Sequence, residues 1–475
     1  MNLVESFFAT AERHGERVAI IAGDGTPTTF RALIQRAASL AAAWKGQGIG
    51  PGDRVLLAMP LGADLYAAIA ALWQLGAVVV FPEPAMGLKG LRHAVTATAP
   101  KAFLSAGSFR FLRYLVPELW RVKRALRPHP AATPLAAIHP ADRDHPALIS
   151  FTSGSTGKPK GIVRSHGFLA AQNACVAAMV DPGDAHAIDL VAFPVFVIVN
   201  LGLGITSVLP DWRLTRHDQA DPAAVARLIA ACHVTRLLVP PSICEKLAEG
   251  TVLPGITTVF TGGGPVFPDL LQRLAAKLPQ ADIVSVYGST EAEPIAHQHM
   301  AEISPADWES MRAGGGLLAG APIPEIAVTL IEDEIVVSGE HVNQGYLDGI
   351  GDATNKLRRD GRIWHRTGDA GRFDDRGRLW LLGRKEAKAG GIYPFAIEVA
   401  ARFWPGVRRA ALVAEGTASI LAVEGDRAYE ATWSRAAESH GAIRVVPVTQ
   451  VPLDRRHRSK VDYGALRRML RGSRQ

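Results

Sequence analysis

Apolar and polar positions follow a helical spacing in some stretches of this chain and form short continuous apolar runs in others. Between Thr29 and Val80 an amphipathic stretch, FRALIQRAASLAAAWKGQG, leads into the apolar run RVLLAMP, a second helical stretch LYAAIAALWQLGA, and then VVVF. The alternation returns at ALISF, AVARLIAACHVTRLLVPPS, TTVFTGGGP, PDLLQRLAAKLP and DIVSVYGST, with glycine or proline at the switches. This pattern predicts stacked βαβ units with parallel sheets, which bind ligands at the carboxyl ends of their strands.

The pattern changes after Gly320. Three short strand-like runs, IAVTLIED, EIVVSGE and GRLWLLGRK, follow one another without a long helix between them and predict a small β-rich unit. Beyond Arg384, helical and strand-like segments alternate again and end in a basic helix. We therefore expect an α/β protein. Residues 1–383 form a large N-terminal domain of two βαβ-type subdomains plus the β-rich unit, and residues 384–475 form a small α+β C-terminal domain.

Composition supports an ordered chain of more than one packing unit. The 475 residues are more than a single core usually serves, and 48% apolar with 20% charged residues can bury enough surface along most of the length. The longest apolar run, Leu190 to Leu209, is interrupted by Pro194, Asn200 and glycines, so we expect no membrane span. The first residues lack the basic segment and apolar core of a secretory signal. Three cysteines without a CxxC pair favour a reducing cytoplasm: Cys175, Cys232 and Cys244.

The formal net charge of +7 favours anionic partners without identifying one. A nucleotide, a coenzyme phosphate or a nucleic acid would each satisfy it. Much of the basic excess lies near the C-terminus, where a solvated face of the last helix is the simpler explanation. Charge alone therefore selects no function.

The segment FTSGSTGKPKG, residues 151–161, directly follows the strand-like run ALIS and has the composition of a phosphate-binding loop. Its glycines let the backbone N–H groups approach an anion, its hydroxyls add donors, and its lysines add charge. The spacing is not that of a Walker A loop, because no Ser or Thr follows the lysine. The alternative is an ordinary solvent-exposed loop rich in serine and glycine. The candidate ligand groups are Thr152, Ser153, Gly154, Ser155, Thr156, Gly157, Lys158 and Lys160.

Two further segments have side chains suited to a nucleotide. In VYGSTE, Tyr287 can stack on an adenine, the Thr290 hydroxyl can donate to a phosphate, and Glu291 is a hard oxygen ligand suited to Mg²⁺. In HRTGD, Asp369 stands beside a turn glycine and can accept from both ribose hydroxyls. Taken singly, these residues could instead be a core tyrosine, a surface charge and a turn-stabilising aspartate.

These segments together resemble the AMP-forming adenylating superfamily, which includes acyl-CoA synthetases, nonribosomal-peptide adenylation domains and luciferases. The phosphate-loop segment is followed, in the expected order, by TGGGP and VYGSTEAEP, similar to the adenine-binding segments, and by EIVVSGEHVNQGYL, similar to the stretch before the ribose site. HRTGDAGRFDDRGRLWLLGRKE resembles the ribose segment and hinge, and PLDRRHRSKVDY resembles the catalytic-lysine motif. The resemblance covers essentially the whole chain, and several ordered matches are more specific than any one of them.

The resemblance implies an ATP-dependent, Mg²⁺-requiring enzyme that converts a carboxylic acid to an acyl-adenylate. It implies that the C-terminal domain is mobile, presents a lysine to the α-phosphate for adenylation, and then rotates for a second half-reaction. A fixed ammonium there favours the transition state, in which negative charge builds on the phosphate oxygens. The residues implied to be catalytic are Lys460, Glu291 and Thr152, with Glu291 also binding the metal; the further nucleotide-binding residues are Gly263, Gly264, Pro265, Tyr287, Gly288, Thr290, Asp369 and Arg384, besides the loop residues given above.

The chain departs from the family pattern at two places. Thioester-forming members commonly have a Pro-x-x-His segment beside the acyl and thiol path, but here FPVFVIVN has Val197 at the histidine's position. The hinge between Arg384 and Pro394 is also a few residues short, with Glu386 as the hinge acid. FPVFVIVNLGLGITSVLPD and PLDRRHRSK together look closest to the branch of fatty-acyl ligases and olefin-pathway β-lactone synthetases, in which a β-hydroxy acid closes on itself without an external thiol.

Several alternatives for the second step and the partners stay open at this stage. We expect acyl transfer to a thiol such as CoA, with β-lactone closure as a comparable alternative and a carrier-protein thiol as a third acceptor. Apolar and small residues from Phe193 to Gly204, together with GGGP, suggest a hydrophobic acyl pocket without a charged anchor for an amino acid, which favours a fatty or β-hydroxy acid. A non-catalytic nucleotide-binding homologue would not need Lys460 and Glu291, which are both present. We expect no nucleic-acid partner, since only the basic tail would support one.

Overall fold

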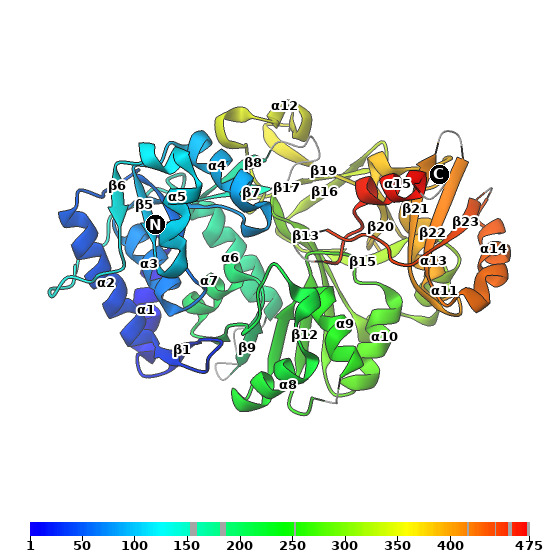
Figure 1. The fold of residues 1–475 in the computed structure, drawn as a ribbon, viewed down its shortest axis with the longest axis horizontal. Coiled ribbons are helices and arrows are strands. Elements are labelled where there is room, and N and C mark those ends of the chain that lie inside the picture. The colour runs from blue at the N-terminus through cyan, green and yellow to red at the C-terminus, as the bar shows by residue number, and fades with distance from the viewer. Residues whose placement is uncertain are drawn as a thin grey trace.

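The computed structural model describes residues 1–152, 159–180, 187–250, 253–415, 418–441, 443–454 and 458–472. The first subdomain is built on a six-stranded sheet of order β6-β5-β3-β4-β7-β8, parallel except for β8 (Figure 1). Its strands are β3 (Arg54–Ala58), β4 (Val78–Phe81), β5 (Ala102–Ser105), β6 (Arg124–Leu126), β7 (Pro146–Thr152) and β8 (Lys160–Ser165), and its helices are α2 (Phe30–Gly46), α3 (Ala63–Gln74), α4 (Gly87–Thr98) and the short α5 (Leu112–Leu115).

Both faces of this sheet are covered, which explains why its strands are continuous apolar runs. In β3, Val55 and Leu57 point into the core shared with α2 and α3, whereas Leu56 and Ala58 point into a second core shared with α4. A parallel strand buried on both faces needs apolar residues at successive positions, without the alternation of a half-exposed strand. The RVLLAMP run therefore encodes a central strand.

The second subdomain contains a fourteen-stranded sheet over the described residues, of order β16-β17-β19-β20-β15-β14-β13-β12-β11-β9-β10-β1-β2, with β18 paired to β19. The strands from β1 to β13 are mostly parallel, and those from β14 onward are antiparallel. The strands are β1 (Val18–Ile21), β2 (Pro27–Thr29), β9 (Ile188–Val191), β10 (Thr206–Val208), β11 (Arg236–Val239), β12 (Thr258–Gly262), β13 (Asp282–Ser289), β14 (Ala292–His299), β15 (Leu317–Pro322), β16 (Ala327–Ile331), β17 (Glu334–Ser338), β18 (Lys356–Arg359), β19 (Arg362–Phe373) and β20 (Leu379–Arg384).

The predicted β-rich unit is present and extends the second subdomain's sheet, because β14 pairs with β15 through Ala296–Pro322 and His297–Ala321. In the sheet, β15 and β14 separate β20 from β13, but Tyr287 near the end of β13 reaches Asp369 on β19 through a hydrogen bond of 2.9 Å. The helices associated with this sheet are α1 (Val4–His14), α6 (His166–Val180), α7 (Pro194–Leu203), α8 (Pro222–Ala231), α9 (Pro241–Glu249), α10 (Pro268–Lys277), α11 (Pro305–Arg312) and α12 (Asp352–Asn355).

The small C-terminal domain is α+β, as predicted. Its three-stranded sheet of order β21-β22-β23 has a core on each face, one shared with α13 and α14 and the other with α15. The boundary after residue 383 stays a prediction; β20 ends at Arg384 and the next long element begins at Pro394. The elements are α13 (Pro394–Ala401), β21 (Val407–Glu415), β22 (Ala418–Gly425), α14 (Glu430–Glu438), β23 (Ile443–Val448) and α15 (Tyr463–Gly472).

The long apolar run from Leu190 to Leu209 is a core segment. It forms the end of β9, the helix α7 and the strand β10, and α7 packs against α1. Within the described part of the chain, every helix is too short or too polar to span a bilayer.

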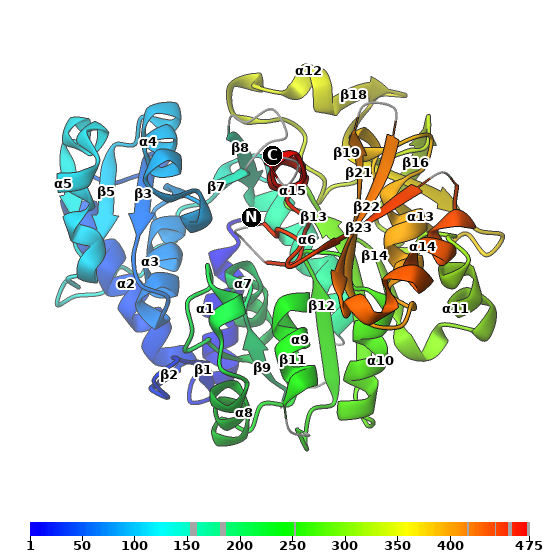
Figure 2. The same ribbon diagram turned by 45° about the vertical axis from the view of Figure 1, so that its right-hand side comes forward.

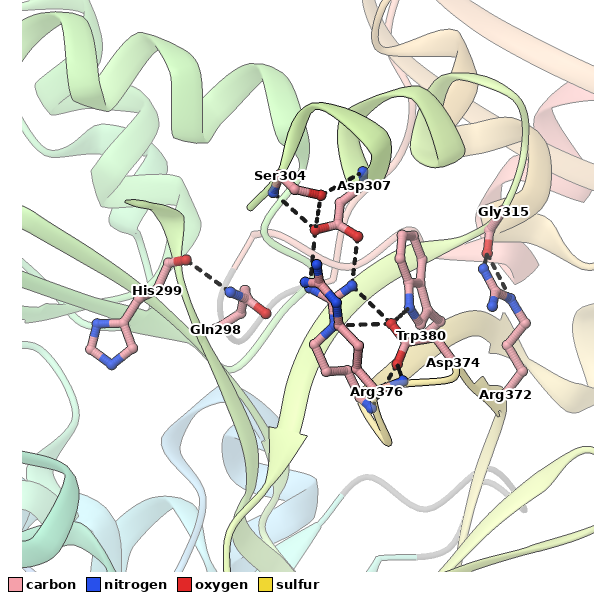
Figure 3. Close-up of polar contacts among 10 residues, drawn as sticks. Gln298, His299, Ser304, Asp307, Gly315, Arg372, Asp374, Arg376 and Trp380 are labelled. Atoms are coloured by element: carbon pink, nitrogen blue, oxygen red, sulfur yellow. Dashed lines mark hydrogen bonds and ion pairs between the residues drawn. The ribbon is translucent and has the colours of Figure 1, made fainter. Parts of the chain in front are cut away.

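An ionic cluster fixes the β19–β20 hairpin against α11 (Figure 3). The Arg378 guanidinium donates to Asp307 Oδ2 at 3.0 Å and to Asp374 Oδ2 at 2.9 Å, and Trp380 Nε1 donates to the same Asp374 oxygen at 3.0 Å. Arg378 holds the pKa of Asp307 well below its usual range. Asp307 also closes the capping box of α11 with Ser304. The hairpin that carries Asp369 and Arg384 is therefore braced at its turn.

A buried carboxyl lies at the centre of the C-terminal domain. Glu398 on α13 accepts hydrogen bonds at one oxygen from Leu412 N (2.8 Å) and from the Tyr463 hydroxyl (2.9 Å), while its Oε2 has no partner among the described residues. Burial raises the pKa of Glu398 from 4.5 to about 7. The carboxyl thus joins α13, β21 and α15 at the cost of burying a titratable group.

We predict that Glu398→Gln changes the pH dependence of stability. Because the pKa of Glu398 is raised in the folded state, the protonated carboxyl contributes its full stabilisation below the unfolded pKa and loses it as the pH rises through about 7. Between pH 5 and 8, the free energy of unfolding of the wild type should therefore fall by about 2 kcal/mol relative to that of Glu398→Gln. Calorimetric unfolding of the C-terminal domain at both pH values measures this, with the exposed Glu430→Gln as control. Parallel pH profiles for wild type and Glu398→Gln would contradict it.

Candidate active site

A cavity of about 990 Å³ lies where the two domains meet. Its wall combines the carboxyl ends of β12 and β13, the β19–β20 hairpin, and residues 454 and 460–463 of the C-terminal domain. Figure 2 shows β12 and β13 on one side of the C-terminal sheet, with α15 near β13. The predicted site residues that line it are Thr152, Lys160, Gly263, Gly264, Pro265, Tyr287, Gly288, Thr290, Glu291, Asp369, Arg384 and Lys460.

The two ends of the predicted phosphate loop face each other at the cavity. Thr152 ends β7 and Lys160 begins β8, and the two residues are paired across this antiparallel ladder. The Lys160 side chain is buried, with its Nζ 5.3 Å from the centroid of the Tyr346 ring. The predicted ligands Ser153, Gly154, Ser155, Thr156, Gly157 and Lys158 lie outside the described residues.

The TGGGP segment after β12 contacts the C-terminal domain. Gly263 has φ +76°, a conformation that favours glycine. A Cβ on Gly264 would lie 2.3 Å from Ser459 Oγ, so a side chain there could not coexist with this position of the C-terminal loop. The two glycines therefore allow the domains to approach, in addition to exposing backbone beside the cavity.

Tyr287, Asp369 and Arg384 form one hydrogen-bonded and ionic group. The Tyr287 hydroxyl donates to Asp369 Oδ2 at 2.9 Å, and Arg384 Nε lies 3.3 Å from Asp369 Oδ1. Burial and the Asp369 charge raise the pKa of Tyr287 well above its usual value, and the same carboxylate raises the pKa of Arg384. Residues from three strands thus present a fixed acceptor beside an aromatic ring.

Glu291 is held by contacts that the sequence did not indicate. The Tyr346 hydroxyl donates to Glu291 Oε1 at 3.0 Å, and the Tyr346 ring lies between Lys160 and Lys356, whose Nζ is 5.1 Å from the ring centroid. Burial lowers the pKa of Lys356 to about 8, and burial with the Lys356 charge lowers the pKa of His365 to about 4. Tyr346 and His365 lie inside segments that resemble the family. Their contacts with Glu291 and Lys356 are tertiary, so the sequence does not indicate them.

The turn between β13 and β14 carries Thr290 and Glu291, just after Gly288 at the end of β13, and is fixed by a buried arginine. Arg164 on β8 donates to the Thr290 carbonyl at 2.8 Å and to Ser150 Oγ at 2.9 Å. This link ties the turn to the same pair of strands that carries the phosphate loop. Arg164 was not predicted, and the only indication in the sequence is a charged residue within an apolar run.

Lys460 lies on the cavity wall as part of a closed loop. Its backbone N–H donates to Asp454 Oδ1 at 2.9 Å, and Asp454 N donates to the Lys460 carbonyl at 2.7 Å. Leu453 and Val461 form a bridge beside them. The chain segment that bears Lys460 is therefore constrained on both sides, which limits where the side chain can reach.

Two arginines of the C-terminal domain dock it on α9 and α10. Arg402, at the end of α13, is buried, lies 3.1 Å from Asp269 Oδ1 and 4.0 Å from Glu245 Oε1, and has its guanidinium 4.5 Å from the Phe267 ring centroid. Arg409 on β21 pairs with the same Glu245. Burial lowers the pKa of Arg402, and the two carboxylates of the N-terminal domain oppose this shift and offset the cost of burying the guanidinium in the interface.

The two departures from the family pattern, at Val197 and in the hinge near Glu386, lie in different places relative to the cavity. Val197 is fully buried in α7, and no residue from Phe193 to Gly204 is among the described residues that line the cavity. Of the two segments expected to form an acyl pocket, GGGP lines this cavity through Gly263, Gly264 and Pro265, and residues 193–204 do not. Glu386 does line the cavity, in the short turn after β20.

Comparisons with known proteins agree on one family. The model of the family described as "AMP-binding enzyme" matches residues 7–347. The olefin beta-lactone synthetase of Stenotrophomonas maltophilia is 31% identical over 91% of this chain and 89% of its own length, and the feruloyl-CoA synthase of an Amycolatopsis species is 30% identical over 88% and 87%. Among solved structures, the ATP-bound MatB of Rhodopseudomonas palustris superposes with a TM-score of 0.82 at 22% identity, covering 100% of this chain and 99% of that one.

We predict that Arg402→Ala undocks the C-terminal domain. Removal of Arg402 takes away the buried cation that links Glu245 and Asp269 to the C-terminal domain; Glu245 keeps Arg409 and Asp269 keeps Arg273, and the loss should weaken docking by roughly 3 kcal/mol. Small-angle scattering should then show a larger radius of gyration. As a control, Arg408→Ala removes an arginine that is 69% exposed and pairs only within its own domain, with Glu424. A scattering profile for Arg402→Ala that matches the wild type would argue against this docking role.

Proposed function

Since the chain belongs to the family of AMP-binding enzymes, we propose that its interdomain cavity binds ATP and a carboxylic acid and joins them as an acyl-adenylate. In this reaction a carboxylate oxygen attacks the α-phosphorus, and the bond from that phosphorus to the departing pyrophosphate breaks. The observation that carries the proposal is that one cavity gathers Thr152 and Lys160, Glu291, and Lys460, which come from distant parts of the chain.

The group formed by Tyr287, Asp369 and Arg384 supports binding of the adenosine half. Asp369 has one oxygen on the Tyr287 hydroxyl and the other near Arg384, so its carboxylate is fixed before a ribose arrives. A prepared acceptor avoids the reorganisation that a mobile side chain would need on binding. The protonated Tyr287 ring, beside Gly288 on the cavity wall, supplies a flat apolar face for adenine.

The donors around Glu291 fit a magnesium ion. In proteins Mg²⁺ is usually held by one or two carboxylates together with substrate phosphates and water, and no cluster of three or more acidic, His or Cys ligands occurs among the described residues. Glu291, oriented by Tyr346, would be the protein ligand. The ion would neutralise phosphate charge when ATP is bound.

Lys160 and Lys460 would stabilise the charge that develops during adenylation. Lys160 approaches from the base of the phosphate loop, and Lys460 approaches from the C-terminal domain. Positive groups that face the α-phosphate gain most when negative charge grows on its oxygens in the transition state. Lys460 meets this need only while its domain is docked, which links catalysis to domain position.

We predict that Lys460→Ala lowers the acid-dependent ATP–pyrophosphate exchange rate by about 10²-fold, since removal of one group that stabilises the transition state has an effect of that size. The KM for ATP should change much less, because the adenosine contacts remain. Arg468→Ala, an exposed cation of α15, is the matched control. Exchange that is unchanged in Lys460→Ala would contradict the proposed role.

For the second step, we propose that the substrate is a β-hydroxy or fatty acid and that β-lactone closure is a candidate reaction. The hydroxyl oxygen would attack the acyl carbon, AMP would leave with the carboxylate oxygen, and the hydroxyl proton would pass to a base or to solvent. Val197 in place of the thiol-path histidine and the 31% identity to an olefin beta-lactone synthetase support this reaction. The identity to a feruloyl-CoA synthase supports acyl transfer to CoA, and a carrier-protein thiol remains the third acceptor.

The acceptor can be tested with a panel of fatty and β-hydroxy acids, each given with ATP and Mg²⁺, with and without CoA. If lactone closure is correct, β-hydroxy acids release AMP without CoA and yield a product lighter than the acid by one water. If CoA is the acceptor, AMP release requires it and a thioester appears. Failure of every acid to support exchange or AMP release would contradict adenylation itself.

We also propose a cytoplasmic location for this enzyme. All three cysteines are free, and burial raises the pKa of Cys175 to about 11 and that of Cys244 to about 12. Such thiols are poorly nucleophilic and suit a reducing compartment.

A further inference from the structure

We propose that the face formed by the start of α4 and residues 107–123 docks this enzyme on an anionic lipid bilayer. This basic-aromatic face comprises the beginning of α4, two short 3₁₀ helices (Gly107–Phe111 and Pro117–Arg121), α5 between them, and the following Lys123. The proposal is independent of which acid the enzyme activates.

Exposed apolar side chains are concentrated on this face. The described residues expose ten large apolar side chains, and six of them lie here. Tyr114 is 79% exposed and Trp120 is 66% exposed, which is unusual for residues of this size in a monomeric surface. Isolated exposed apolar residues need no explanation, but a cluster of six indicates a surface that is covered in use. The six are Leu88, Phe109, Phe111, Tyr114, Leu115 and Trp120.

Positive charge is concentrated on the same segment. Residues 87–127 contain nine lysines and arginines and one acidic residue, so this short segment has an excess of eight cations while the whole chain has a net charge of +7. The single acid, Glu118, lies 3.6 Å from Arg92 and is partly neutralised by it. Six of the cations belong to the face, namely Lys89, Arg92, Arg110, Arg113, Arg121 and Lys123, whereas the Arg124 side chain donates to the Gln47 carbonyl at the end of α2.

The exposed rings are held in place by the local structure. Trp120 Nε1 donates to the Arg113 carbonyl at 2.6 Å, and Arg113 in turn donates to the Val122 carbonyl at 3.0 Å. The Phe111 and Tyr114 rings lie 6.4 Å apart, and the Arg110 guanidinium lies 4.8 Å from the Phe111 ring centroid. The buried Val116 and Leu119 anchor the segment in the core shared with α4. The rings are therefore presented outward by an ordered scaffold.

The composition fits a bilayer surface better than a protein partner. Tryptophan and tyrosine favour the headgroup region of a bilayer, where the Tyr114 hydroxyl would stay hydrated. The Trp120 N–H is already paired with the Arg113 carbonyl, so its ring can enter this region without an unpaired donor. Arginine and lysine stems cover apolar surface while their charged ends reach lipid phosphates. A protein interface would instead be depleted of charge at its centre. The alternation of aromatic rings and cations along residues 109–123 is therefore what a surface that binds an anionic bilayer requires.

The face lies away from the cavity. α4 and α5 belong to the first subdomain, which lies on the opposite side of the molecule from the C-terminal sheet β21–β23 in both views (Figures 1 and 2). None of the residues of this face is among the described lining of the cavity. Docking would therefore leave the C-terminal domain facing away from the bilayer, with the cavity accessible.

Sedimentation of the full-length protein with sucrose-loaded vesicles tests the proposal. Vesicles of phosphatidylcholine mixed with phosphatidylglycerol should bind the wild type at least about tenfold more tightly than phosphatidylcholine alone, and raising the salt from about 50 to 500 mM should largely abolish the difference. Two sets of variants separate the contribution of the aromatic rings from that of the positive charges. The first set is Tyr114→Ser with Trp120→Ser, and the second is Arg110→Gln with Arg121→Gln and Lys123→Gln. Each set should reduce binding to anionic vesicles about tenfold.

The control is Tyr429→Ser with Arg427→Gln, an exposed ring and cation on the C-terminal domain, which should bind as the wild type does. Circular dichroism and ATP–pyrophosphate exchange without vesicles should be unchanged in all variants, since none alters the cavity. Equal binding of the wild type to neutral and anionic vesicles would overturn the proposal. A concentration-dependent dimer that both variant sets dissociate would also overturn it, because this face would then be a protein interface. Tighter binding to duplex DNA than to the vesicles would overturn it as well.

Discussion

The docking of the C-terminal domain on α9 and α10 is the interaction on which the rest of the site depends. Arg402 is buried between Asp269, Glu245 and the Phe267 ring, and Arg409 reaches the same glutamate. A buried cation is costly unless its partners are in place, so the ion pairs specify one relative position of the domains. In that position Ser459 fits against Gly264, and the adjacent Lys460 reaches the cavity. Without docking, the cavity would lose one wall.

The two sides of the cavity differ in how rigidly they are prepared. On the N-terminal side, Asp369 and Glu291 each accept from a tyrosine hydroxyl, and burial with the neighbouring carboxylate keeps both tyrosines protonated by raising their pKa values. These carboxylates are oriented before any ligand binds. On the C-terminal side, Lys460 lies in a segment whose backbone is held by Asp454, and its place at the cavity depends on how its domain is docked. One group of contacts is thus set within the N-terminal domain, whereas the other depends on the contact between the two domains.

The residues that line the cavity could be singled out in the sequence more readily than the residues that hold them in place. Tyr287, Glu291, Asp369, Arg384 and Lys460 stand in segments with a recognisable order, and the structure gathers them in one cavity. Their supports could not be predicted, since Tyr346 reaches Glu291 and Arg402 reaches Asp269 only through tertiary contacts.

The fold was predicted in its elements more fully than in their connections. Long helices such as α2 and buried strands such as β3 follow from periodicity and apolar runs. The joining of the β-rich unit to the second subdomain depends on β14 and β15, whose sequences AEPIAHQH and LLAGAP have little strand character. The acyl pocket expected from residues 193–204 and GGGP stays a prediction, because α7 also packs against α1 and an apolar run has the same composition in a core as in a ligand pocket.

Transfer of an oxygen atom from the acid to AMP tests the central claim most directly. If an acyl-adenylate forms in this cavity, an acid labelled with ¹⁸O in its carboxylate will release AMP that contains one labelled oxygen, since the bridging oxygen leaves with the phosphate when the acyl group is transferred. Mass spectrometry of the AMP after complete turnover should show this label. Unlabelled AMP, or ADP and phosphate as the products, would contradict the account.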